Sequence, residues 1–287
     1  MGDNKKISLV ECPRDAMQGW KEFIPTAQKI KYISALLKVG FDVIDFGSFV
    51  SPKAIPQMAD TKQVVDALDL SDSVSTLLAI VANTRGAEEA AGYEKIESIG
   101  FPFSISETFQ QRNTNSSIEQ SLETVARIQE ICTRKDKEAV IYISMGFGNP
   151  YGDAWSEQIV FGWVEKIASL GIKTISLADT VGLATSEQVF QITKYLVDAM
   201  PAHEIGVHLH SSPFNWQEKA GAAIRAGCKR MDGALRGVGG CPMADDELVG
   251  NMDTEKLIPY FQGLGIQSEI NEAALAEASF LAAKIFS

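Results

Sequence analysis

Eight short apolar runs recur along this chain, and several of the stretches between them show the spacing of amphipathic helices. The runs lie at residues 7–11, 41–46, 74–81, 96–104, 139–144, 172–178, 205–210 and 229–235. Apolar residues repeat at helical intervals in the stretches 25–39, 117–134, 156–170, 186–200 and 215–226. Strand therefore alternates with helix throughout, and this alternation predicts a parallel α/β architecture.

A repeated glycine marks the place where a helix gives way to the next strand. Gly40, Gly171 and Gly227 each follow a helical stretch, where glycine adopts a left-handed conformation at little cost. Eight strand units, with no Gly-x-Gly-x-x-Gly after the first, predict a closed (β/α)8 TIM barrel rather than an open doubly wound sheet. Residues from about 247 to 287 predict extra C-terminal helices. Because no Pro/Ser-rich linker divides the chain, we expect one catalytic domain over 1–287.

Composition excludes two broad classes of protein. Of the 287 residues, 45% are hydrophobic and 22% charged, and no apolar run reaches the length of about 18 residues that crosses a bilayer. The formal net charge of −11 disfavours a nucleic-acid partner. The first strand follows the N-terminus so closely that we expect no signal or transit peptide. Together with four scattered cysteines, which indicate reduced thiols, this predicts a soluble, cytoplasmic protein.

Two histidines, one residue apart, end the seventh apolar run. On a strand, residues i and i+2 point the same way, so His208 and His210 can bind one ion; alternatively, two polar rings hydrogen-bond to neighbours at a strand end. In TIM barrels the active site lies at the carboxyl ends of the strands. Polar residues also follow the first, second, sixth and eighth runs, so carboxylate, guanidinium, imidazole and thiol groups are predicted at one rim.

Arg14 and Asp15 follow the first strand directly. Asp15 could complete a two-histidine, one-carboxylate metal site with His208 and His210, although an isolated aspartate here is also typical of a helix N-cap. Arg14 carries a fixed positive charge that suits a developing oxyanion, and a structural salt bridge is its alternative role.

Three further residues are candidates for proton transfer. Asp45 and Asp179 lie near strand ends, where burial and a neighbouring cation would shift the pKa of a carboxyl group in opposite directions. Cys241 lies between Gly240 and Pro242 in a loop, where its thiol could donate a proton. Free cysteine is otherwise a small, buried, apolar residue, and this alternative stays open.

Six segments together carry a resemblance to a known family. They are Glu11-Cys-Pro-Arg-Asp-Ala-Met-Gln18, Ser48-Phe-Val-Ser-Pro-Lys53, Pro56-Gln-Met-Ala-Asp60, Ser176-Leu-Ala-Asp-Thr-Val-Gly182, Val207-His-Leu-His210 and Gly239-Gly-Cys-Pro242. In this order, over essentially the whole chain, they resemble the 3-hydroxy-3-methylglutaryl-CoA (HMG-CoA) lyases. That family belongs to a superfamily of metal-dependent TIM-barrel lyases and Claisen-type synthases.

The resemblance implies cleavage of HMG-CoA to acetoacetate and acetyl-CoA by a metal-assisted retro-Claisen mechanism, with Mg²⁺ or Mn²⁺ as cofactor. The implied metal ligands are Asp15, His208, His210 and Asn251. Arg14 would stabilise the enolate of acetyl-CoA, Cys241 would lie on a mobile loop, and the acyl-CoA site would be lined by Asp179, Gln18, Ser48, Ser176 and Thr180. The donor atoms alone would suit zinc or ferrous iron as well as magnesium. A homodimer is also what the family suggests.

The chain departs from the family pattern at three places. Asp45 stands where the family has glutamate, so the carboxylate is shorter by one methylene, about 1.5 Å. The segment between Cys241 and Asn251 is one residue longer, and Ser211 replaces the aspartate that commonly follows the second histidine. These differences leave room for a different 3-hydroxyacyl-CoA as substrate.

Two other functions compete with a lyase. A Claisen-type synthase of the isopropylmalate or citramalate kind would condense acetyl-CoA with a 2-oxo acid. Such enzymes usually carry a further C-terminal region, whereas this sequence stops soon after the barrel. A non-catalytic barrel that binds an acyl-CoA or a partner protein would need no metal. The predicted metal ligands therefore favour the lyase.

Overall fold

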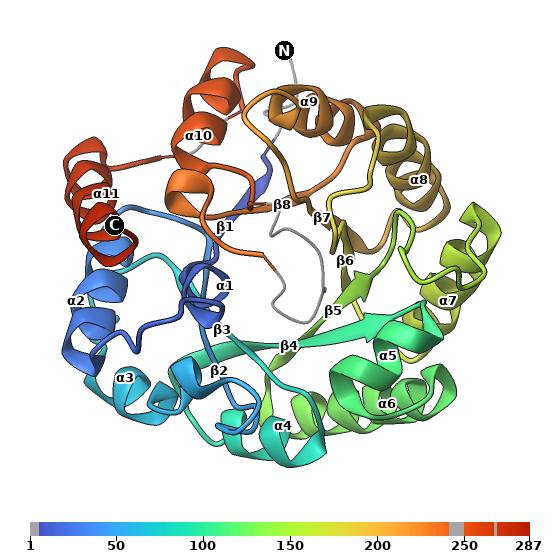
Figure 1. Cartoon of the computed structure of the whole chain (residues 1–287), viewed down its shortest axis with the longest axis horizontal. Coiled ribbons are helices and arrows are strands. Elements are labelled where there is room, and N and C mark those ends of the chain that lie inside the picture. Colours follow the sequence, from blue (N-terminus) through green and yellow to red (C-terminus); the bar gives the residue numbers. More distant parts are fainter. Residues whose placement is uncertain (1–5, 241–249, 267–268) are drawn as a thin grey trace.

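Eight parallel strands close into a barrel in the computed structural model, which describes residues 6–240, 250–266 and 269–287. Each strand pairs with the next one along the chain, and β8 pairs back with β1 (Figure 1). The strands are β1 Ser8–Glu11, β2 Val43–Ser48, β3 Thr76–Ile80, β4 Ile96–Ser104, β5 Glu138–Ser144, β6 Thr174–Ala178, β7 Glu204–His208 and β8 Arg230–Gly233. The predicted TIM barrel is confirmed, and each predicted strand overlaps one of these.

Helices surround the barrel (Figure 1). They are α1 Pro13–Gln18, α2 Thr26–Leu36, α3 Thr61–Ala67, α4 Thr84–Ala90, α5 Glu107–Thr114, α6 Ile118–Lys135, α7 Glu157–Ser169, α8 Ser186–Ala199, α9 Trp216–Ala226, α10 Thr254–Gly263 and α11 Glu272–Ile285, with 3-10 turns η1 Pro56–Met58 and η2 Leu235–Gly237. α10 and α11 confirm the predicted C-terminal helices, and α11 packs against α2. The sequence pattern missed α1, α3, α4 and α5, which span only 6 to 8 residues.

The glycines expected at helix ends adopt the left-handed conformation. The angle φ is +97° at Gly40, +90° at Gly171 and +88° at Gly227. At the opposite ends, α6 and α8 begin with capping boxes built on Ser117 and Thr185, whose hydroxyls accept a backbone N–H of the first turn. Local sequence therefore determines where several of these helices begin and end.

The barrel interior differs in chemistry from the layer between barrel and helices. Along β6, Ile175 and Leu177 pack into the large outer core, so Ser176 between them faces inward. The interior has its own small apolar cluster, made of Val10, Cys12, Val43, Leu78, Ile80, Val140 and Tyr142. The remaining interior positions are free for polar side chains that serve a site at the mouth.

Two expectations about the class of protein can be compared with the structure. Across the described ranges, every helix is too short or too polar to span a membrane. The described cysteines Cys12, Cys132 and Cys228 are buried, and Cys12 and Cys132 are free thiols, as expected for reduced cysteines.

A buried glutamate ties the first strand to the segment that follows the last one. Glu11 accepts hydrogen bonds from the Leu235 backbone N–H at 2.8 Å and from the Thr254 hydroxyl at 2.6 Å. Burial raises the pKa of Glu11 to about 8, although both hydrogen bonds oppose the shift. Folded protein therefore retains a proton that the unfolded chain releases above its ordinary pKa of 4.5.

We predict that this residue makes the protein less stable as pH rises from about 4.5 to about 8. The expected slope is about 1.4 kcal/mol per pH unit. Glu11→Gln keeps the shape of the side chain but cannot ionise, so the variant should show a flatter profile and be the more stable protein at the alkaline end. Urea unfolding of both proteins across this range measures the slopes, and parallel profiles would contradict the raised pKa.

Candidate active site

Asp15, His208 and His210 meet at the mouth of the barrel. Asp15 lies in the first turn of α1, directly after β1, and the histidines lie at the end of β7 and just beyond it. Their ligand atoms all lie within 4.8 Å of one another. Leu209 packs outward into the core, which leaves both imidazoles on the inner side, as the strand alternation predicted. Cys12, not Asp15, occupies the N-cap of α1.

Asp15 is oriented by three side chains from different parts of the chain. One carboxylate oxygen accepts from Arg14 Nη1 at 2.9 Å and from Gln18 Nε2 at 2.8 Å, and the other accepts from Asn251 Nδ2 at 2.7 Å. Burial alone would raise the pKa of Asp15, but Arg14, the two histidines and Asn251 outweigh it and lower the pKa to about 2. Asp15 is thus held as an anion, the form that binds a cation.

Arg14 is fixed between two carboxylates. Its Nη2 donates to Asp45 at 2.5 Å and its Nε donates to both Asp45 oxygens at 3.1 and 3.2 Å, while Nη1 bonds to Asp15. Burial raises the pKa of Asp45, and Arg14 opposes that shift; the two carboxylates raise the pKa of Arg14 against its burial. β2 continues to Ser48, so Asp45 lies within the strand and not at its end.

The two histidines have different electrostatic surroundings. His208 Nδ1 lies 3.1 Å from an Asp232 oxygen, and this contact raises the pKa of His208 even though burial opposes it. Burial, together with the charge of His208, lowers the pKa of His210 to about 4. Asp232 was not predicted as a site residue, although it lies in the last apolar run, five residues after Gly227.

Asp179 connects two loops at the mouth of the barrel. Its carboxylate accepts the Ala184 backbone N–H at 2.9 Å and the Lys219 ammonium at 2.7 Å, and Lys219 also donates to the His210 carbonyl at 2.9 Å. Burial raises the pKa of Asp179, with Lys219 opposing it. Next to it, the Thr180 hydroxyl accepts a backbone N–H of the loop after β5. Lys219 was not predicted, because it lies 40 residues away in the chain and no local pattern links it to Asp179.

A cavity of about 420 Å³ opens at this end of the barrel. Its polar lining includes Arg14, Asp15, Gln18, Thr180, His208 and His210, and its apolar wall is formed by Val50, Ala54, Ile55, Ile80, Val81, Ala82, Pro102 and Phe109. The site therefore combines an ion-binding corner, formed by Asp15, His208 and His210, with an apolar surface that suits an acyl or pantetheine chain.

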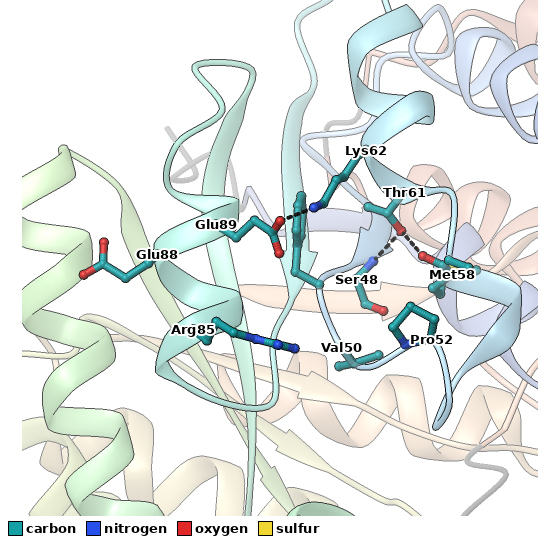
Figure 2. Close-up of a pocket in the computed structure, with 11 residues that line it drawn as sticks. Ser48, Val50, Pro52, Met58, Thr61, Lys62, Arg85, Glu88 and Glu89 are labelled. Carbon is teal, nitrogen blue, oxygen red and sulfur yellow. Dashed lines mark hydrogen bonds and ion pairs between the residues drawn. The ribbon is translucent and has the colours of Figure 1, made fainter.

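Three residues implied to line the substrate site lie outside the lining of this cavity. The Asp179 carboxylate contacts Ala184 and Lys219 instead. Ser176 is fully buried inside the barrel, and its hydroxyl has no hydrogen-bond partner among the described residues. Ser48 lines a second cavity, of about 670 Å³, between the segment after β2, the start of α3 and the helix α4 (Figure 2). The Lys62–Glu89 ion pair lies at its edge, and Val50 borders both cavities (Figure 2).

A glycine leaves room for the Asn251 amide. Gly239 has a φ of +124°, and a Cβ built on it would lie 2.2 Å from Asn251 Nδ2 and 3.0 Å from an Asp15 oxygen. Asn251 also donates to the Val238 carbonyl at 3.0 Å and pairs through its backbone with His210. Residues 238–240 and 250–251 thus close one side of the corner. Cys241, the predicted thiol donor, lies outside the described residues.

These residues fit a divalent cation. A carboxylate of low pKa and a neutral imidazole are both in the state that binds metal, and two histidines with one carboxylate are a common ligand set. Because Gly239 has no Cβ, Asn251 can approach Asp15 and place its amide beside the ligand cluster.

Comparisons with known proteins cover almost the whole chain. The HMGL-like family model matches residues 6–281. The mitochondrial hydroxymethylglutaryl-CoA lyase of Mus musculus is 32% identical over 277 residues, which cover 96% of this chain and 84% of that protein. A Pseudomonas aeruginosa protein named 3-hydroxy-3-isohexenylglutaryl-CoA/hydroxymethylglutaryl-CoA lyase is 32% identical and covers 96% of this chain and 91% of its own.

Solved structures share the fold. The HMG-CoA lyase of Acinetobacter baumannii, in complex with coenzyme A and 3-methylmalate, superposes with a TM-score of 0.91 at 30% identity; the match covers 99% of this chain and 92% of that one. The HMG-CoA lyase of Brucella melitensis superposes with a TM-score of 0.89 at 28% identity, over 98% of this chain and 99% of its own.

Proposed function

Because this chain belongs to the HMGL-like family, as its six segments indicated, we propose that it cleaves HMG-CoA to acetoacetate and acetyl-CoA. The observation that carries the proposal is the corner formed by Asp15, His208 and His210 beside Arg14, at the carboxyl ends of β1 and β7. An apolar cavity opens directly onto this corner, so an acyl-CoA can bring its reacting carbons to it.

Asp15, His208 and His210 would hold a divalent ion, with Asn251 as a fourth ligand. We propose Mg²⁺ or Mn²⁺, on the strength of the family and not of the donor atoms, which suit zinc and ferrous iron equally. The ion, when bound, polarises the hydroxyl and a carbonyl oxygen of the substrate.

Arg14 would stabilise the negative charge that forms when the carbon–carbon bond breaks. One N–H on each of its three nitrogens is used by Asp15 and Asp45, which leaves two N–H groups on the terminal nitrogens for the thioester oxygen of the acetyl-CoA enolate. Because both carboxylates hold the guanidinium in place, it needs little reorganisation as this charge develops.

Two protons must move for the reaction to balance. The tertiary hydroxyl loses a proton as it becomes the ketone of acetoacetate, and the enolate gains one at carbon to become acetyl-CoA. As the sequence suggests, we assign the first transfer to Asp179, whose neighbours Ala178 and Thr180 line the cavity while its own carboxylate pairs with Lys219, and the second to the Cys241 thiol. Asp45 was the other carboxylate predicted for proton transfer, but both of its oxygens accept hydrogen bonds from Arg14.

The test is an assay of the purified protein with HMG-CoA and Mg²⁺ or Mn²⁺. We predict that acetoacetate and acetyl-CoA form in equal amounts and that a chelator abolishes turnover, which the metal then restores. Enzymatic determination of acetoacetate and of acetyl-CoA measures both products. If neither metal supports acetoacetate formation, HMG-CoA is not the substrate.

A second candidate is a lyase for a bulkier 3-hydroxyacyl-CoA. The apolar wall of the cavity and the Pseudomonas aeruginosa relative, whose name includes an isohexenyl substrate, favour it over a Claisen-type synthase. A series of thioesters with longer branches at C3 separates the two lyases, and release of free CoA from acetyl-CoA and a 2-oxo acid would identify the synthase. The homodimer and the cytoplasmic location stay predictions, testable by sedimentation and by cell fractionation.

A further inference from the structure

A buried arginine crosses the barrel interior beneath the histidines. In the strand register, Tyr142 lies beside Ser176, Ser176 beside Gly206, and Gly206 beside Arg230. A Cβ built on Gly206 would lie 2.9 to 3.2 Å from the Cβ, Cγ and Cδ atoms of Arg230, so the arginine side chain passes directly over this glycine. Its Nη2 reaches the Tyr142 hydroxyl at 3.4 Å.

Asp232 joins this arginine to the candidate metal site. It lies two residues after Arg230 on β8 and is 1% exposed. One of its oxygens lies 3.6 Å from Arg230 Nε, and the other lies 3.1 Å from His208 Nδ1. Asp232 therefore links the guanidinium of Arg230 to the imidazole of His208 through two contacts inside the barrel.

We propose that Asp232, which forms an ion pair with Arg230, is a positioning residue that fixes the ring and the tautomer of His208. The carboxylate accepts the Nδ1 hydrogen, which leaves the Nε2 lone pair for the ion shared with Asp15 and His210. This inference rests on the proposed function, since it assigns a role toward the same metal.

The same side chains could be taken for a second metal site. Cys12, His208 and Asp232 also present ligand atoms within 4.8 Å of one another. Arg230 already balances the charge of Asp232, and a dication placed there would stand next to this guanidinium in the barrel interior. A hydrogen bond between Asp232 and His208 avoids that repulsion and is therefore the better account of the cluster.

The experiment measures binding of Mn²⁺ alone, by calorimetry and electron paramagnetic resonance. Asp232→Ala should bind Mn²⁺ about 10- to 100-fold more weakly than the wild type. Asp232→Asn, which keeps an acceptor oxygen, should recover part of the affinity. Ser176→Ala is the matched control. Ser176 is also fully buried in the barrel interior, but its hydroxyl has no hydrogen-bond partner among the described residues, so the variant should bind Mn²⁺ with unchanged affinity. Unchanged affinity in folded Asp232→Ala overturns the proposal.

A second measurement needs no variant. Nitrogen-15 spectra of the wild type with Mg²⁺ should show His208 protonated at Nδ1, and a bare Nδ1 overturns the proposal. A Cd²⁺–thiolate absorption band that Cys12→Ser removes would also overturn it, because the inner cluster would then be a metal site. Wild-type protein that binds no Mn²⁺ would instead refute the metal site of the proposed function, an outcome distinct from failure of Asp232 alone.

Discussion

Replacing Asp15 with alanine is expected to abolish metal binding and to lower kcat/KM by about 10³-fold or more. A bound metal ion contributes several kcal/mol to transition-state stabilisation, and each 1.4 kcal/mol or so corresponds to a factor of ten. Asp15 supplies the only carboxylate of the described three-residue ligand cluster, and its oxygens also hold Arg14, Gln18 and Asn251. The substitution therefore removes a ligand and releases three neighbours at once.

A matched variant separates this effect from a general loss of stability. Asp60 is 6% exposed against 5% for Asp15, and it likewise forms a buried ion pair, with Lys29, but it does not line the active-site cavity. Asp60→Ala should destabilise the fold and still bind Mn²⁺ with wild-type affinity. Titration with Mn²⁺ and steady-state kinetics of both variants make the comparison. Wild-type Mn²⁺ affinity in Asp15→Ala would remove it from the ligand set.

The barrel could be predicted because its signal is repeated along the chain. Eight apolar runs, three of them preceded by a glycine, repeat the same strand-and-helix unit along the chain. An error in one element therefore does not change the predicted barrel. The helices α3, α4 and α5 were missed because 7 or 8 residues cover barely two turns, too few to show a period of 3.6.

The metal corner could be predicted from local geometry, whereas the contacts that orient it could not. The alternation of a strand is enough to place His208 and His210 on one side. By contrast, Asn251 reaches Asp15 across 236 residues of sequence, and that contact depends on how the chain closes after β8. A contact of this kind leaves no local pattern in the sequence.

Ser48 shows how a small irregularity changes the outcome. The pairing of β2 with β3 shifts in register between Asp45 and Gly47, as in a β-bulge. An extra residue in a strand moves the side chains after it to the opposite face. Without the shift, Ser48 would face away from the side that Asp45 faces, because the two lie three residues apart; with it, Ser48 pairs with Ile80 as Asp45 pairs with Leu78, and both partners belong to the interior cluster. The register shift could not be read from the apolar pattern.

Gly239→Ala is expected to lower Mn²⁺ affinity and turnover by about 100-fold without unfolding the protein. The new methyl group would lie 2.2 Å from Asn251 Nδ2, so the amide must leave Asp15 or the loop must move. A displacement of about 1 Å in a catalytic constellation is enough for such a loss. Mn²⁺ titration and kcat/KM measure the effect, and urea unfolding shows whether the fold is retained.

Backbone strain must be separated from the collision, because alanine is disfavoured wherever φ is positive. Gly148 has a φ of +121°, close to that of Gly239, yet the nearest atom to a Cβ built there is Leu183 Cδ1 at 3.9 Å, an ordinary contact. Gly148→Ala therefore carries strain of a similar kind without touching the metal corner, and it should bind Mn²⁺ and turn over as the wild type does. If both alanine variants lost activity alike, strain would explain the result; if both kept it, close contact between Asn251 and Asp15 would be dispensable for the metal site.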